Sequence, residues 1–153
     1  MKFLENIFNS KWKWISCCVD CEGTITMNYK KKYRKINCYI AFSNDDLNLA
    51  KLFGKEIGVG KLFTHKNNTG RHLKTIHYRW VIYKADEQIL VLPKLIPHLI
   101  TIKKERARIL LSFARSRVKR RLKSPGIYKS KIPYSKEEYI LFEEMRKTYK
   151  ESL

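Results

Sequence analysis

The sequence predicts a mixed α/β (α+β) fold built on one four-stranded antiparallel sheet. Hydrophobic residues recur at helical spacing in some segments and at every second position in others. These segments follow the order helix, strand, strand, helix, strand, strand, helix, and further helices come after them. Each pair of strands is joined by a polar segment, which is typical of antiparallel hairpins. We expect one domain over residues 1–153, with a core (1–118), a basic loop (119–134) and a C-terminal helix (135–153).

The first expected helix spans residues 12–22 and carries two apolar stripes on neighbouring faces. One stripe consists of Trp14, Cys17, Cys18 and Cys21, and the other consists of Ile15 and Val19. Because apolar or small residues cover much of its circumference, we expect this helix to be buried on two sides. Gly23 follows the helix and is expected to end it in a left-handed turn.

Two expected hairpins follow, separated by a helix. The strands of the first hairpin cover residues 24–30 and 35–42, and those of the second cover residues 61–66 and 75–83. Polar or basic residues alternate with apolar residues in the strands, which predicts one face packed on the core and one polar, cationic face. The intervening helix is expected to start at the polar segment 43–46 and to end at Gly58.

Three further helices are expected after the second hairpin. A short one covers Ala85–Leu92 and is stopped by Pro93, because proline cannot donate a backbone hydrogen bond. A longer one covers residues 100–118. The last begins near Ser135, where the spacing of Ser135 and Glu138 predicts a capping box.

The charge of the chain points to a polyanionic partner. Lys and Arg number 33 against 14 Asp and Glu, which gives a formal net charge of +19. A positive field of this size argues against small neutral or cationic substrates. It favours nucleic acid, since neutralising phosphates releases counterions. A ribosomal protein or a membrane-surface protein is the alternative that charge alone leaves open.

The hydropathy of the chain predicts an intracellular, soluble protein with no membrane partner. No apolar run approaches the roughly 18 residues of a spanning helix. The N-terminus lacks the shape of a signal peptide. Both an organelle, either chloroplast or mitochondrion, and a prokaryotic cytoplasm fit these features.

The four cysteines are Cys17, Cys18, Cys21 and Cys38. Cys18 and Cys21 form a C-x-x-C pattern, which is found in redox pairs and in halves of zinc sites. Because no second C-x-x-C and no H-x-x-x-H pattern accompanies it, we interpret these cysteines as small buried residues.

The segment Ile15-Ser-Cys-Cys-Val-Asp-Cys-Glu-Gly23 resembles the nine-residue LAGLIDADG signature of homing endonucleases. Residues 40–62 are similar to the second strand, helix and turn of that family. Residues 97–108 are similar to its region with a basic active-site residue, and residues 134–147 to its closing helix. The resemblance covers nearly the whole chain in one order. It implies an αββαββα fold with a four-stranded antiparallel DNA-binding sheet.

The resemblance also implies a homodimer. Two signature helices pack side by side in the family, and this chain has one copy, so a twofold dimer and a near-palindromic DNA site follow. The expected interface residues are Trp14, Cys17, Cys18, Asp20 and Cys21.

The implied active site lies at the end of the signature helix. Glu22 takes the place of the family's metal-binding acid, with the carbonyl of Cys21 as a helper and Mg²⁺ (or Mn²⁺) as the cofactor. Lys103 matches the active-site lysine and Asn44 a polar position that organises water. The alternatives are a surface helix end for Glu22, a plain helix N-cap for Asn44 and one more surface cation for Lys103. For Asp20 we favour a cap on the neighbouring helix end across the dimer over metal binding.

We expect the polar face of the sheet to contact base edges in the major groove. The side chains expected to do so are Thr24, Thr26, Asn28, Lys30, Lys35, Asn37, Tyr39, Lys61, His65, His77 and Arg79. Contacts to phosphates are expected from Arg34, Arg71, Arg117, Lys119, Arg120 and Lys123.

Taken with the resemblance, these features predict an intron-encoded homing endonuclease that makes metal-dependent double-strand cuts in a long, near-palindromic DNA target. The alternative is a protein of the same fold that binds without cutting, either an RNA-splicing maturase with intron RNA as its partner or a DNA-binding regulator. A small ribosome-associated basic protein is a third hypothesis, and it would require neither Glu22 nor Lys103.

Overall fold

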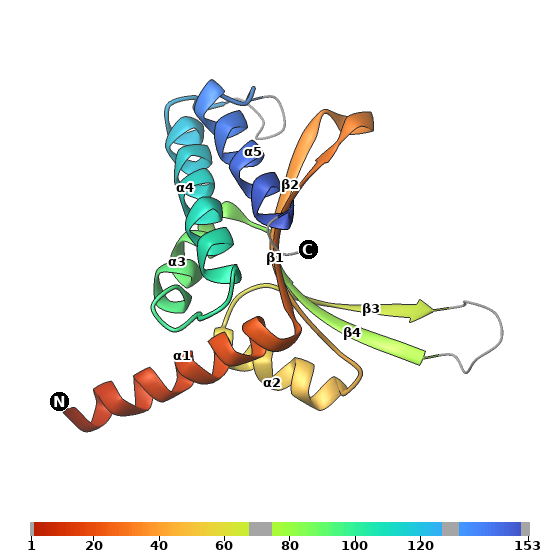
Figure 1. Cartoon of the computed structure of the whole chain (residues 1–153), viewed down its shortest axis with the longest axis vertical. Coiled ribbons are helices and arrows are strands. Elements are labelled where there is room, and N and C mark those ends of the chain that lie inside the picture. Colours follow the sequence, from red (N-terminus) through yellow and green to blue (C-terminus); the bar gives the residue numbers. More distant parts are fainter. Residues whose placement is uncertain (1, 68–74, 127–131, 151–153) are drawn as a thin grey trace.

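A computed structural model describes residues 2–67, 75–126 and 132–150 of the chain (Figure 1). The elements in order are α1 (Lys2–Glu22), β1 (Gly23–Lys30), a 3-10 turn η1 (Lys31–Tyr33), β2 (Lys35–Asn44), α2 (Leu47–Ile57), β3 (Lys61–Asn67), β4 (Thr75–Ile82), α3 (Ala85–Leu95), α4 (Lys103–Leu122) and α5 (Lys136–Lys150). The helices lie to the left of and below the sheet in Figure 1, and the two hairpins extend to the right. Among the described helices, none is long and apolar enough to cross a membrane.

The four strands form one antiparallel sheet in the order β1-β2-β4-β3, which confirms the predicted sheet. The register places Asn28 opposite Asn37, and His65 opposite His77. Since side chains directly opposite each other share a face, the predicted polar residues of all four strands lie on one face.

The other face of the sheet packs on the helices. Ile25, Ile40 and Phe42 are almost fully buried there, together with Phe53 of α2. The rings of Phe42 and Phe53 stack with 4.6 Å between their centroids. This contact fixes α2 against β2, the strand that ends at Asn44.

Helix α1 starts ten residues earlier than the predicted helix, at Lys2 rather than at Trp12. Over residues 12–22, it is fully buried on one side only. Ile15 and Val19 are fully buried, whereas Cys17 and Cys21 on the other predicted stripe are exposed. In a single copy, therefore, only one of the two predicted stripes is buried as we expected.

Gly23 does not adopt the left-handed conformation that we expected, since its φ is not positive. It is required for a different reason. A Cβ at this position would lie 2.6 Å from both the Cα and the carbonyl oxygen of Val19, so a larger residue would collide with α1. Helix α1 can thus pass into β1 without an intervening loop. Helix α2 does end at Gly58, as predicted, and Gly58 adopts the left-handed conformation, with φ 78°.

Pro93 does not stop α3, which contradicts the predicted end at Leu92. The helix continues to Leu95, and the N–H of Ile96 still donates to the carbonyl of Leu92 at 2.9 Å. Pro93 is exposed, whereas Leu92 and Leu95 on either side of it are fully buried. Burial of these two leucines offsets the hydrogen bond that proline cannot make.

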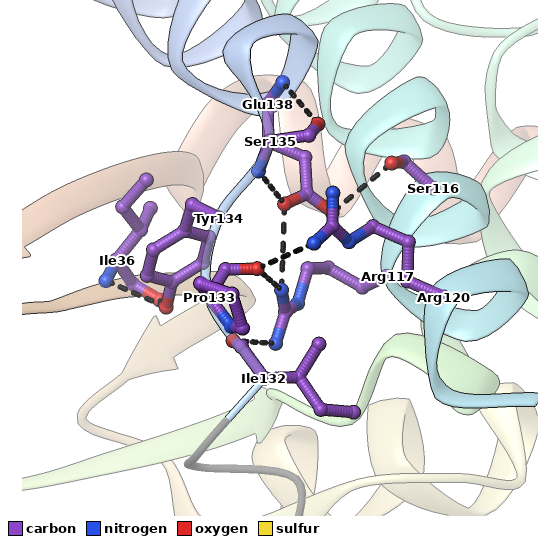
Figure 2. A network of polar contacts seen from close by, with 9 residues as sticks. All are labelled: Ile36, Ser116, Arg117, Arg120, Ile132, Pro133, Tyr134, Ser135 and Glu138. Carbon is purple, nitrogen blue, oxygen red and sulfur yellow. Dashed lines mark hydrogen bonds and ion pairs between the residues drawn. The ribbon is translucent and has the colours of Figure 1, made fainter. Parts of the chain in front are cut away.

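Helix α5 begins with the predicted capping box. The N–H of Glu138 donates to the Ser135 hydroxyl at 3.2 Å, and the Ser135 N–H donates to the Glu138 carboxylate at 2.9 Å. Glu138 is also fully buried, and its carboxylate accepts from Ser116 at 3.0 Å and Arg117 at 3.3 Å. Figure 2 shows this network joining α4 to the start of α5.

Arg117 and Arg120 are used within the chain rather than held free for phosphate contacts. Arg117 donates to the carbonyls of Ile132 and Pro133, both at 3.2 Å, and lies 4.7 Å from the Tyr134 ring centroid. Arg120 donates to the Pro133 carbonyl at 3.0 Å. Arg117 in particular corrects our expectation, because its cation neutralises the buried Glu138 carboxylate.

Replacing Glu138 with alanine tests this network. We expect Glu138→Ala to lower the free energy of unfolding by about 3 kcal/mol, because it removes the buried carboxylate that pairs with the partly buried Arg117. Urea unfolding followed by circular dichroism measures the loss. Glu143→Ala is the control, since it removes an exposed ion pair with Arg146 and should cost little. Equal losses in the two variants would contradict the account.

Candidate active site and nucleic-acid interface

The candidate active site is centred on Glu22, the last residue of α1. Its side chain is exposed, and its Oε2 accepts a hydrogen bond from the Asn44 amide nitrogen. Asn44 is the last residue of β2, and its own oxygen accepts from the Asp46 N–H at 2.8 Å. The fold thus brings together two predicted active-site residues that are 22 positions apart in the sequence.

Asn44 is not the N-cap of α2, which was the alternative interpretation of this residue. Asp46 has that role, because its carboxylate accepts from the N–H groups of Asn48 and Leu49. Asn44 is thus not required to cap α2, and its amide nitrogen donates to Glu22.

Asp20 and Lys103 form a reciprocal clamp between the end of α1 and the start of α4. The Lys103 ammonium group donates to the carbonyls of Val19 at 2.8 Å and Asp20 at 2.7 Å. In return, the Asp20 carboxylate accepts from the Ile100 N–H at 2.9 Å and from the Thr101 hydroxyl. Lys103 thus satisfies two of the carbonyls that a helix end leaves without partners, and its positive charge favours the negative end of the helix dipole.

The surroundings of Lys103 lower its pKa. Partial burial is the main cause, and the charge of Arg106 acts in the same direction, while Asp20 and Cys21 oppose it. The Lys103 ammonium group therefore loses its proton more readily than an exposed lysine would.

Two thiols of α1, those of Cys18 and Cys21, and the Cys38 thiol of β2 have raised pKa values. Burial is the main cause that raises the pKa of Cys18 to about 11, and it also raises the pKa of Cys38. The pKa of Cys21 is raised chiefly by a hydrogen bond with Cys17. Since the thiolate is the metal-binding form, these shifts disfavour metal binding at neutral pH. In the described part of the chain, no three His, Cys, Asp or Glu side chains are grouped to hold a metal.

The predicted DNA-contacting residues mostly lie uncovered on the polar face of the sheet. Those that are exposed are Thr24, Asn28, Lys30, Lys35, Lys61 and His65, and those that are partly buried are Asn37, Tyr39, His77 and Arg79. Of the predicted phosphate contacts, Arg34, Lys119 and Lys123 are exposed, and Arg71 lies outside the described residues. The cluster is therefore cationic and open to solvent in a single copy.

Thr26 differs from its neighbours on this face. Only 4% of it is exposed, and its hydroxyl forms a hydrogen bond with the Tyr149 hydroxyl of α5. The C-terminal helix therefore reaches the edge strand β1, and Thr26 anchors it there.

Sequence analysis did not identify three residues on or beside this face, which are Asp45, Tyr149 and Phe63. Asp45, next to Asn44, contacts the His77 ring through its carboxylate, and Tyr149 covers Thr26. Both contacts join distant segments, so no local pattern could have indicated them. The third is Phe63, which is exposed between Lys61 and His65. The alternation of β3 already places Phe63 on the same face as Lys61 and His65. It was not among the predicted base contacts because it is apolar.

Neither a family model nor a curated protein sequence matches this chain. Solved structures of homing endonucleases do. I-CvuI, in complex with its target in the presence of Ca²⁺, has 19% sequence identity and a TM-score of 0.57, and the match covers 94% of this chain and 95% of I-CvuI. The archaeal intron-encoded enzyme I-Vdi141I, complexed with DNA, has 16% identity and a TM-score of 0.63, with 91% and 84% covered.

The chain has the LAGLIDADG homing endonuclease fold. This confirms the resemblance inferred from the sequence at the level of the fold. The LAGLIDADG homing endonuclease I-GzeII, in complex with its DNA target, matches with 18% identity and a TM-score of 0.60. That match covers 86% of this chain but 42% of I-GzeII, so one copy of this chain corresponds to less than half of the longer protein.

Replacing Asp20 tests whether the clamp acts within one chain. We expect Asp20→Ala to lower the free energy of unfolding by about 1–2 kcal/mol, because two donors lose their acceptor. Urea unfolding at protein concentrations spanning a hundredfold range should show the same loss throughout. A loss confined to concentrations at which the chain dimerises would instead indicate a cap across the dimer. Glu22→Gln is the control, since it keeps an oxygen that can accept from Asn44.

Proposed function

We propose that this chain is a homodimeric, divalent-metal-dependent endonuclease that cuts both strands of a long, near-palindromic double-stranded DNA target. The observation that carries the proposal is the position of Glu22. This exposed carboxylate lies where the uncovered stripe of α1 ends and β1 begins, the first strand of the cationic sheet face. The candidate active site, dimer contact and DNA contact therefore adjoin one another.

The charge arrangement of the sheet supports DNA as the partner. Lys30 and Lys35 lie directly opposite each other at the end of the β1–β2 hairpin, and both are exposed. Like charges in such a pair repel each other and destabilise the hairpin. A DNA phosphate backbone along this face would offset that repulsion, because its negative charges attract both lysines.

The exposed stripe of α1 supports the dimer. Cys17 and Cys21 lie one helical turn apart and are exposed, with the partly buried Trp14 and Cys18 beside them. A second copy placed on this stripe would give α1 the second buried side that its apolar circumference predicts. The match to less than half of I-GzeII is consistent with two copies making one complete unit.

The residues at the end of α1 fit a divalent cation. Mg²⁺ (or Mn²⁺) takes one or two carboxylates and fills its remaining positions with water and phosphate oxygens. Glu22 is exposed, and one of its two oxygens is occupied by Asn44. Glu22 from each copy, helped by the Cys21 carbonyl, would hold the cation. Such a cation supplies a more acidic water and stabilises charge on the scissile phosphate. I-CvuI was crystallised with DNA in the presence of Mg²⁺ and of Ca²⁺.

The residues of the chain have distinct parts in this proposal. Asn44 orients the Glu22 carboxylate through its amide nitrogen and contributes to positioning water at the site. Lys103 holds the end of α1 in place and adds a positive charge beside the phosphate-binding region. The polar sheet face binds each half-site and sets the position of the DNA relative to Glu22.

Glu22→Gln tests the proposal. With a library of palindromic duplexes and Mg²⁺, we expect this variant to lose double-strand cleavage by about 100-fold or more while it retains DNA binding. Gel analysis of end-labelled duplexes measures cleavage, and a filter or mobility assay measures binding. Glu105→Gln, which changes an exposed carboxylate two positions from Lys103, is the matched control and should still cut.

Tight binding without cleavage by the wild type would overturn the endonuclease proposal. Binding to duplex DNA would then favour a regulator, and preferential binding to a structured intron RNA would favour a splicing maturase.

A further inference from the structure

Phe63 is an exposed aromatic residue on a face that is otherwise largely polar and basic. It lies on β3 with 43% of its surface exposed and is not part of the buried core. Its neighbours on the same face of the strand, Lys61 and His65, are both exposed. A large part of this apolar side chain is therefore in contact with water, which is a poor environment for it.

The structure also shows why the Phe63 ring stays uncovered. Phe63 lies directly opposite Arg79 of β4, whose long side chain could lie across the ring. The Arg79 guanidinium is instead placed 4.8 Å from the ring centroid of Tyr39, a β2 residue on the far side of β4 from β3. On its other side Phe63 has no neighbouring strand, because β3 is at the edge of the sheet. The cation that could cover Phe63 is therefore directed away from it.

The spacing along β3 fits DNA base pairs. Residues two apart on a strand are about 6.8 Å apart, and successive base pairs are about 3.4 Å apart, so alternate side chains meet about every second base pair. Lys61 and His65 would then contact DNA about two base pairs to either side of Phe63. Charged and hydrogen-bonding groups on both sides would hold the ring against the floor of the groove.

The major groove presents one apolar group, the 5-methyl group of thymine. We propose that Phe63 is a specificity-determining residue that contacts a thymine methyl group in each half-site of the DNA target. This inference rests on the proposed DNA-binding function and adds to it a contact of stated chemistry. In this arrangement the binding energy of Phe63 comes from removing ring and methyl surface from water, not from hydrogen bonds.

The test replaces single thymines with deoxyuridine, which lacks only the methyl group. Duplexes that bind the wild-type protein are first selected from a random library in the presence of Ca²⁺. In the selected site, each symmetry-related pair of thymines is then replaced by deoxyuridine, and the dissociation constant is measured for the wild type and for Phe63→Ala. Ile76→Ala is the control, since Ile76 is a similarly exposed apolar residue of the same hairpin on the opposite face of the sheet.

We expect one pair of thymines at which the wild type and Ile76→Ala each lose about fourfold in affinity per half-site on removal of the methyl group. Phe63→Ala should show no loss at that pair. If Phe63→Ala keeps the same methyl dependence as the wild type, or if no thymine pair shows one, the inference is wrong. If the wild type enriches no sequence, the DNA-binding proposal itself fails and this inference fails with it. Circular dichroism of Phe63→Ala should match the wild type, since the ring is outside the core.

Discussion

The clamp between Asp20 and Lys103 is the constraint on which the candidate site depends. Helix α1 has to end at one place, pass into β1 without a loop, and present Glu22 to solvent. Lys103 holds the terminal carbonyls of α1, while Asp20 holds the backbone and hydroxyl donors just before α4. The end of α1 thus supplies acceptors for donors beside the start of α4, and the start of α4 supplies a donor for the last carbonyls of α1. Gly23 completes the arrangement, because a side chain there would collide with Val19 and push β1 away from Glu22.

A single chain leaves the end of α1 open to solvent. Over residues 12–22, Ile15 and Val19 are buried, Cys17 and Cys21 are exposed, and Glu22 at the end of the helix is exposed as well. On the sheet face, Asp45 lies against His77, and Glu22 lies at the end of β2 against Asn44. In the proposed dimer, a second copy would cover the exposed stripe of α1, and DNA would neutralise the cationic face.

The parts that could be predicted from the sequence rest on local patterns. Alternation along β1 and β2 predicted which residues share a face, and the register of the sheet confirms it. The Ser135–Glu138 capping box was also predictable, because its donors and acceptors lie within one turn. Pro93 and Arg117 were predicted incorrectly because contacts with other segments decide their roles, and Gly23 because the close backbone of Val19, rather than a left-handed turn, requires a glycine. Burial of Leu92 and Leu95 outweighs the helix-stopping tendency of Pro93, and the buried Glu138 claims Arg117. The hydrogen bond from Asn44 to Glu22 depends on the whole β1–β2 pairing, so the sequence indicated the two residues but not their contact.

The central claim is that DNA is cut at the end of α1, where two copies of the chain meet. Mapping both cleavage positions on end-labelled strands of a selected palindromic duplex tests it most directly. If α1 stripes meet across the twofold axis, both Glu22 residues lie near that axis. The two cuts should then be symmetric and within about half a helical turn, roughly five base pairs, of the centre of the site. Cuts that are asymmetric, or that lie a full turn or more from the centre, would contradict the account.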